Sequence, residues 1–491
     1  MGEQPGPDIS DIGRKAGRGA VWSLLGTLVT RAGSFILGLI LARLLAPADF
    51  GTYAVALAAT QFVMVVKDVG VMSAVVQWRG RLEEIAPTAT TLTMCSALGL
   101  YGLFWFGAPY FSALAGSEEA TSVVRVLTAV ILVEAVTAVR SAALLRWFRT
   151  GKNAKAVLAG FLVNAPVAIV LAVNGAGAYS FAWGQLIGSV VTGVFMLMYA
   201  RLPYRFGFDR EIAGKLLRFG IPSAAGIALE IVLLNVGYII VGNIMGASWL
   251  GFYLMAFNVS SWVPGIIGSA IRMVSIAGFS RLAERDEESL SLGVQKSLPL
   301  LIAMVAPLAV FMAVLAHPLI IFIYGQEWEL SAGVLRFLAV LMLVRMLTSF
   351  ALDILNGQGA TRSTVWMNLG HAAAMIPAVI VGANLDGIRG AAIGQAAAAV
   401  LVALPLAMIA VQRAGVRLAP VLPDLVRPAI GALVCGGVML GLTMLTQGSP
   451  FVQLVVAGGA GLLAYTLVVV TRDQFHLLSD RVVRLLPARA R

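Results

Sequence analysis

Apolar runs long enough to cross a membrane recur along this chain, separated by short polar connections. The run 24–45, for example, continues for a full helical crossing. A helix needs about 20 apolar residues to span the hydrocarbon core, whereas barrel strands alternate polar and apolar residues. Hydrophobic residues make up 59% and charged residues only 12% of the chain, too few charges to cover a water-facing surface. The pattern predicts an all-α membrane protein.

The sequence predicts fourteen transmembrane helices. They lie at 19–44, 49–76, 86–112, 120–145, 154–174, 178–200, 216–245, 249–277, 297–323, 331–356, 363–384, 388–411, 424–446 and 450–471. Most of the 35 Lys and Arg residues fall in connections on the side of the N-terminus, the bias typical of cytoplasmic loops. We therefore expect a multi-pass protein of the bacterial cytoplasmic (inner) membrane, with both termini cytoplasmic. The thin spread of basic residues over many loops argues against a nucleic-acid partner.

A weak internal repeat indicates a duplicated architecture. A shift of 200 residues brings Gly51-Thr52-Tyr53 over Gly251-Phe252-Tyr253, and a shift of 210 brings Gly184-Gln185 over Gly394-Gln395. Parallel repeats are typical of transporters whose substrate path lies between the halves. We predict two pseudo-symmetric six-helix lobes, 1–213 (helices 1–6) and 214–413 (helices 7–12). Residues 414–491 add helices 13 and 14 and a cytoplasmic tail.

Polar and ionisable residues inside the predicted spans are the candidate substrate-binding residues. At membrane depth such groups usually face a protein interior or a water-filled cavity. The residues predicted to line a central hydrophilic cavity are Arg31, Lys67, Asp68, Arg272, Arg345 and Asn258. Guanidinium groups bind phosphate oxygens in a bidentate manner, so the cavity would suit a pyrophosphate head that carries sugars. The alternative is that these side chains only hold neighbouring helices together.

Carboxylates within the spans raise the question of energy coupling. Glu230 and Asp353 are candidates for sharing a proton or cation, and the alternative is an ion pair such as Asp353 with Arg345. Glu134 and Arg140 do not face each other on one helix, so they are assigned no mutual pairing. The chain has no phosphate-binding loop, no H-E-x-x-H motif and no long segment outside the spans. We therefore predict no enzyme, no metal site and no cofactor.

The first predicted hairpin resembles a known family. Segment 43–53, with Pro47, Phe50, Gly51 and Tyr53, resembles the LAR-x-L-x-P-x-x-FG-x-Y signature of Wzx-type polysaccharide flippases. Three further motifs are similar to those of the same family, Asp68-Val69-Gly70, Met255-Ala256-Phe257-Asn258 and Gly325-Gln326-Glu327-Trp328. Together they resemble the colanic-acid/succinoglycan exporter branch of the multidrug/oligosaccharidyl-lipid/polysaccharide (MOP) superfamily.

This resemblance implies MATE-like lobes that work by alternating access. It implies translocation of undecaprenyl-pyrophosphate-linked oligosaccharide repeat units from the cytoplasmic to the periplasmic leaflet, for exopolysaccharide or lipopolysaccharide synthesis. The implied partners are the lipid-linked substrate, membrane lipids, and a polysaccharide polymerase with its chain-length regulator. Three alternatives stay open, namely a cation-coupled multidrug exporter, a peptidoglycan lipid-precursor flippase, and a non-transporting scaffold for polysaccharide assembly.

Overall fold

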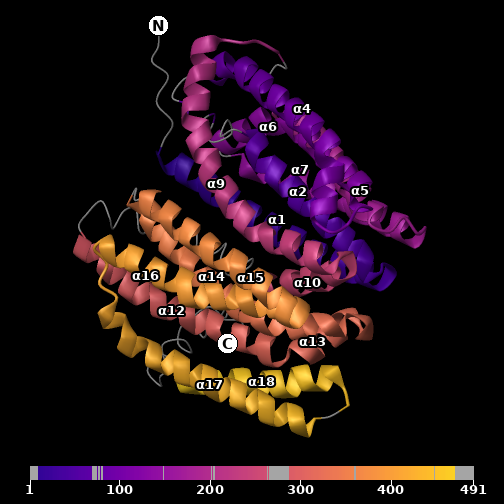
Figure 1. Ribbon diagram of the computed structural model, residues 1–491. Coiled ribbons are helices and arrows are strands. Elements are labelled where there is room, and N and C mark those ends of the chain that lie inside the picture. The colour runs from indigo at the N-terminus through magenta and orange to yellow at the C-terminus, as the bar shows by residue number, and fades with distance from the viewer. Residues whose placement is uncertain are drawn as a thin grey trace, which may run out of the picture. The chain divides into compact units, whose positions relative to one another are not determined.

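Helices make up nearly all of the described chain (Figure 1). The computed structural model describes residues 9–68, 81–147, 149–200, 205–262, 287–358, 361–446 and 448–469, with the single positions 75, 78, 202 and 264. Nine helices within these ranges are long and apolar enough to cross a membrane. The predicted all-α class is confirmed, and the protein is a multi-pass membrane protein. The predicted number of fourteen spans stays a prediction.

The chain forms two compact units, Met1–Leu254 and Met255–Arg491. The helices of the first unit are α1 (Ile9–Leu44), α2 (Pro47–Asp68), α4 (Leu82–Leu114), α5 (Ala120–Thr128), α6 (Val130–Arg146), α7 (Thr150–Val173), α8 (Tyr179–Tyr199), α9 (Arg210–Met245) and most of α10 (Ala247–Ser260). Within this unit α6 packs against α4, α8 and α2. The packing of α6 on α2 brings together two spans that are far apart in the sequence.

The starts of α2 and α10 cross at two glycines. A Cβ atom on Gly51 would collide with the carbonyl oxygen of Ala247, and one on Gly251 would collide with the carbonyl oxygen of Pro47. The 200-residue shift noted in the sequence relates Gly51 to Gly251 and Pro47 to Ala247, so the two contacts are reciprocal. Only glycine allows backbones to approach this closely.

The second unit contains the remaining helices. They are α12 (Glu287–Val314), α13 (Ala316–Tyr324), α14 (Glu329–Gly357), α15 (Thr361–Ala398), α16 (Leu404–Arg413), α17 (Leu422–Leu445) and α18 (Pro450–Val469), with short helical turns η2 (Gln326–Trp328), η3 (Ala399–Ala403) and η4 (Ala419–Val421). Helices α17 and α18 run side by side and pack on α12 and α13 (Figure 1). The predicted lobe boundaries at 213/214 and 413/414 stay predictions.

Helix α15 is two helical arms joined by a sharp turn. The backbone is non-helical at Asp386 and at Gly387, where φ is 56°. A Cβ atom on Gly382 would collide with the carbonyl oxygen of Gly390, and the reverse also holds. The arms therefore fold back on each other at glycines, and they correspond to the spans predicted at 363–384 and 388–411.

Prolines inside two helices leave carbonyl groups that side chains then satisfy. A proline has no N–H group, so the carbonyl four residues before it loses its helical hydrogen bond. Pro109 in α4 frees the Trp105 carbonyl, which accepts a hydrogen bond from Nε of Arg125 at 3.0 Å. Pro307 in α12 frees the Ala303 carbonyl, which accepts one from the Tyr465 hydroxyl at 2.9 Å. The second bond ties α18 to α12.

Candidate functional site

Four of the predicted site residues of the first unit can be placed on helices. The Arg31 side chain is exposed on α1, and that of Lys67 is buried in the last turn of α2. Asp68 ends α2, but its side chain lies outside the described residues. The same is true of the side chain of Glu230 on α9, and Arg272 lies wholly outside them.

In the second unit, Arg345 on α14 has aromatic and sulfur neighbours. Its guanidinium carbon lies 6.0 Å from the centroid of the Phe257 ring, and Nη1 donates to the sulfur of Met342 at 3.7 Å. A cation over an aromatic face is attracted by the ring electrons. Asn258, which follows Phe257 on α10, is exposed, whereas Asp353 on α14 is buried.

His371 on α15 joins this group around Arg345. The ring is close enough to Arg345 to interact with its positive charge. Its Nε2 atom is buried and has no hydrogen-bond partner among the described residues.

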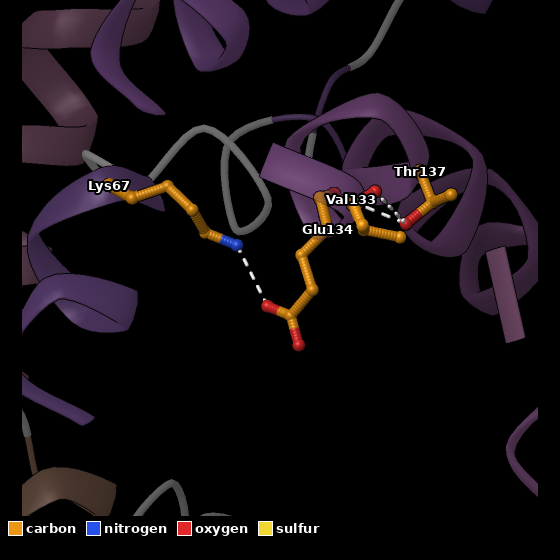
Figure 2. Close-up of polar contacts among 4 residues, drawn as sticks. All are labelled: Lys67, Val133, Glu134 and Thr137. Atoms are coloured by element: carbon orange, nitrogen blue, oxygen red, sulfur yellow. Dashed lines mark hydrogen bonds and ion pairs between the residues drawn. The ribbon is translucent and has the colours of Figure 1, made fainter. Parts of the chain in front are cut away.

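An ion pair between two helices of the first unit joins Lys67 to Glu134. Figure 2 shows the two side chains reaching toward each other, with Lys67 Nζ donating to Glu134 Oε2 at 2.9 Å. The Lys67 side chain is 3% exposed, but that of Glu134 is 42% exposed. Glu134 lies near the middle of the span Ala120–Arg146, so the carboxylate of the pair lies within a membrane-spanning segment.

Further polar contacts involve the helices that carry this pair. Asn235 Nδ2 on α9 donates to Gln61 Oε1 on α2 at 2.9 Å. Arg140, six residues beyond Glu134, is buried, and its Nη2 atom donates to the carbonyl oxygen of Leu202 at 3.1 Å. Glu134 and Arg140 thus have different partners, in agreement with the helical geometry. The pairing of Glu134 with Lys67 was missed, because spacing along one helix carries no information about a second helix.

Two other features of the described residues, the arrangement of metal-ligating side chains and an apolar surface hollow, do not suit a metal ion or a charged ligand. No group of three or more His, Cys, Asp or Glu side chains in the described ranges could hold a metal ion. A surface hollow of about 440 Å³ between α7 and α8 is lined only by apolar residues, Pro166, Val167, Val170, Leu171, Trp183 and Ile187.

Comparison with known proteins identifies the family. The family described as polysaccharide biosynthesis protein matches residues 40–332, more than half of the chain. The chain belongs to this family. Among polysaccharide biosynthesis proteins it is similar to the succinoglycan biosynthesis transport protein ExoT of Rhizobium meliloti (strain 1021), with 26% identity over 374 residues, 75% of this chain and 74% of that protein.

A second relative extends the match. The lipopolysaccharide biosynthesis protein WzxC of Escherichia coli (strain K12) is 22% identical over 386 residues, 77% of both chains. The resemblance to Wzx-type flippases predicted from segment 43–53 is confirmed by these matches.

Solved structures show which fold this polysaccharide biosynthesis protein has. The lipid II flippase MurJ in an inward closed conformation matches with a TM-score of 0.77 at 14% identity, over 94% of this chain and all of that chain. An inward-facing multidrug resistance MATE family transporter of the MOP superfamily matches with a TM-score of 0.63 at 18% identity, over 80% of this chain and 98% of that chain. The predicted MATE-like fold is confirmed.

Proposed function

We propose that this protein translocates undecaprenyl-pyrophosphate-linked oligosaccharide repeat units from the cytoplasmic to the periplasmic leaflet. It acts in exopolysaccharide or lipopolysaccharide synthesis as a transporter and not as an enzyme, by alternating access through a cationic cavity. It lies in the bacterial inner membrane with both termini cytoplasmic. Family membership and the names of the relatives, a succinoglycan transport protein and a lipopolysaccharide biosynthesis protein, support this proposal.

The observation that carries the proposal is the buried side chain of Lys67 at the end of α2, which is paired with Glu134 inside the membrane-spanning segment Ala120–Arg146. A charge inside a span is costly and is usually retained for a function. Arg31 adds a second cation, because it lies 13 residues before the end of α1 and is exposed. In the predicted span 19–44 that is about 20 Å from the end of the span, too deep for the side chain to rest at the membrane surface. Both cations match the charge of a pyrophosphate head group.

One alternative function is favoured by a specific observation. The high TM-score with the lipid II flippase MurJ favours a peptidoglycan lipid-precursor flippase. The cation-coupled multidrug exporter fits less well, because Arg31 and Lys67 would repel cationic drugs. The two flippase functions differ in their consequence for the cell, since loss of surface polysaccharide leaves growth intact and loss of peptidoglycan precursor does not.

A deletion strain tests the proposal. We expect it to grow normally but to lack surface polysaccharide, and the wild-type gene to restore the polymer. Arg31→Ala and Arg272→Ala should each fail to restore it at normal protein level, because each removes a cation from the cavity. Arg81→Ala is the matched control, since the Arg81 side chain is 80% exposed just before α4, and it should restore the polymer fully.

Two results would contradict the proposal. A lethal deletion would indicate the peptidoglycan role instead. Wild-type amounts of surface polysaccharide in both arginine variants would remove these residues from the substrate path and with them the cationic mechanism.

The proposal also includes residues for cation coupling and two partner proteins. Glu230 on α9 and Asp353 on α14 are the proposed cation-coupling residues, and the burial of Asp353, which is 7% exposed, supports that role. Asp68 and Asn258 are proposed to bind the substrate together with Lys67 and Arg345. The lipid-linked product would pass to a polysaccharide polymerase and its chain-length regulator.

A further inference from the structure

The Lys67–Glu134 pair is unequally exposed. With its counter-ion in place, the Lys67 side chain is almost fully covered, whereas the Glu134 side chain is nearly half exposed. An ionised carboxylate near the middle of a span is too costly to face hydrocarbon, so its exposed side faces a hydrated opening. An anion that reaches Lys67 through this opening must therefore meet Glu134 first.

Glu134 is also the more weakly held of the two partners. Within the described part of the chain, Lys67 Nζ is the only hydrogen-bond partner of the Glu134 carboxylate, and it engages one oxygen. The neighbouring Thr137 hydroxyl donates to the backbone carbonyl oxygens of Val133 and Glu134 instead of to the carboxylate (Figure 2). Lys67 has at least one further interaction. When the pair opens, the carboxylate is the group that moves.

From this geometry we infer that Glu134 is an exchangeable counter-ion, which a phosphate of the substrate displaces from Lys67. The inference rests on the proposed function and adds a residue that controls substrate affinity. In the empty site Glu134 neutralises the buried ammonium, and in the loaded site a phosphate oxygen takes its place. The charge of Lys67 is thus compensated in both states, which avoids a buried unpaired charge during transport.

This exchange predicts that removing the Glu134 charge raises the affinity for the phosphate head group and lowers the rate of polymer export. A carboxylate that competes for Lys67 lowers the affinity for phosphate but helps to expel the head group after translocation. Glu134→Gln keeps the size of the side chain and removes its charge. The variant should bind the head group more tightly and export polymer more slowly, a combination that simple destabilisation would not produce.

The test measures binding of inorganic pyrophosphate and of undecaprenyl pyrophosphate to the full chain in nanodiscs. We expect Glu134→Gln to bind both about tenfold more tightly, the order of magnitude of a partly exposed charge-assisted hydrogen bond. The matched control is Glu83→Gln on α4, because Glu83 is also exposed and paired, with Arg81 at 3.9 Å. It should bind as the wild type does.

A second variant tests whether the effect of Glu134→Gln depends on Lys67. The double variant Lys67→Met/Glu134→Gln removes both charges of the pair together, and it should bind pyrophosphate more weakly than the wild type at an unchanged unfolding temperature. In the Lys67→Met background, adding Glu134→Gln should no longer tighten binding, because the competition is for Lys67 itself.

The outcomes separate the inference from the proposed function. If the wild type binds the head group, and Lys67→Met weakens binding but Glu134→Gln does not strengthen it, the exchange is refuted and the proposed function stands. If the wild type binds neither pyrophosphate probe, both are refuted. Tighter binding by Glu134→Gln together with unchanged or faster export would also refute the role of Glu134 in release.

Discussion

Tyr465→Phe tests most directly whether the Tyr465 hydroxyl stabilises the second unit by satisfying a carbonyl group that a proline leaves without its helical hydrogen bond. Pro307 leaves the Ala303 carbonyl without a helical partner, and the Tyr465 hydroxyl bonds to that oxygen at 2.9 Å. Tyr465 is buried in a cluster with Leu315, Cys435, Met439 and Ala457. The substitution removes one oxygen atom and leaves this packing otherwise unchanged.

The expected cost of Tyr465→Phe is about 1–3 kcal/mol of unfolding free energy. A hydrogen bond between neutral groups is worth roughly 1 kcal/mol, and a buried carbonyl left unsatisfied raises the cost to about 3 kcal/mol. Water is absent from the hydrocarbon core, so it cannot replace the hydroxyl there. Tyr110→Phe is the matched control, since Tyr110 on α4 is 81% exposed, and it should leave stability unchanged.

A double-mutant cycle with Pro307→Ala identifies the cause. Alanine at 307 restores an N–H group that can bond to the Ala303 carbonyl, so Tyr465→Phe should then cost less than about 1 kcal/mol. Stability is measured as heat-induced unfolding of the purified protein in one detergent. An equal cost of Tyr465→Phe in both backgrounds would refute the reasoning, because the tyrosine would then stabilise the protein without the proline-freed carbonyl.

Two further predictions use the same unfolding assay. Gly251→Ala should destabilise the protein by roughly 1–3 kcal/mol, because the new Cβ atom would lie 2.7 Å from the Pro47 carbonyl carbon, where backbone leaves no side chain to move aside. Gly99→Ala is its control, with no atom within 4 Å, and equal stability of the two variants would contradict the close crossing of α2 and α10. Trp328→Ala should cost about 3–5 kcal/mol, because Trp328 is fully buried before α14. Trp249→Ala, at an exposed position, should cost much less, and similar costs would contradict the burial of Trp328.

The sequence indicates which charged residues are candidates for the site, but it does not give their contacts. Lys67 and Arg345 were singled out because ionisable residues stand out in apolar spans. The structure pairs Lys67 with Glu134, which lies 67 residues away on another helix, and places Arg345 over Phe257. Neither contact leaves a periodic signal, since helix periodicity describes one helix at a time.

The sequence by itself determined the membrane class, the charges within the spans and, through segment 43–53, the family. These are local properties, because apolar length and a hairpin signature are read within one stretch of chain. The tertiary structure decided that Lys67 meets Glu134, that Tyr465 satisfies a carbonyl freed by Pro307, and that Gly51 and Gly251 share a crossing. Lipid is as apolar as a helix surface, so hydrophobicity does not select the neighbours of a membrane helix. Close packing and polar contacts between helices select them.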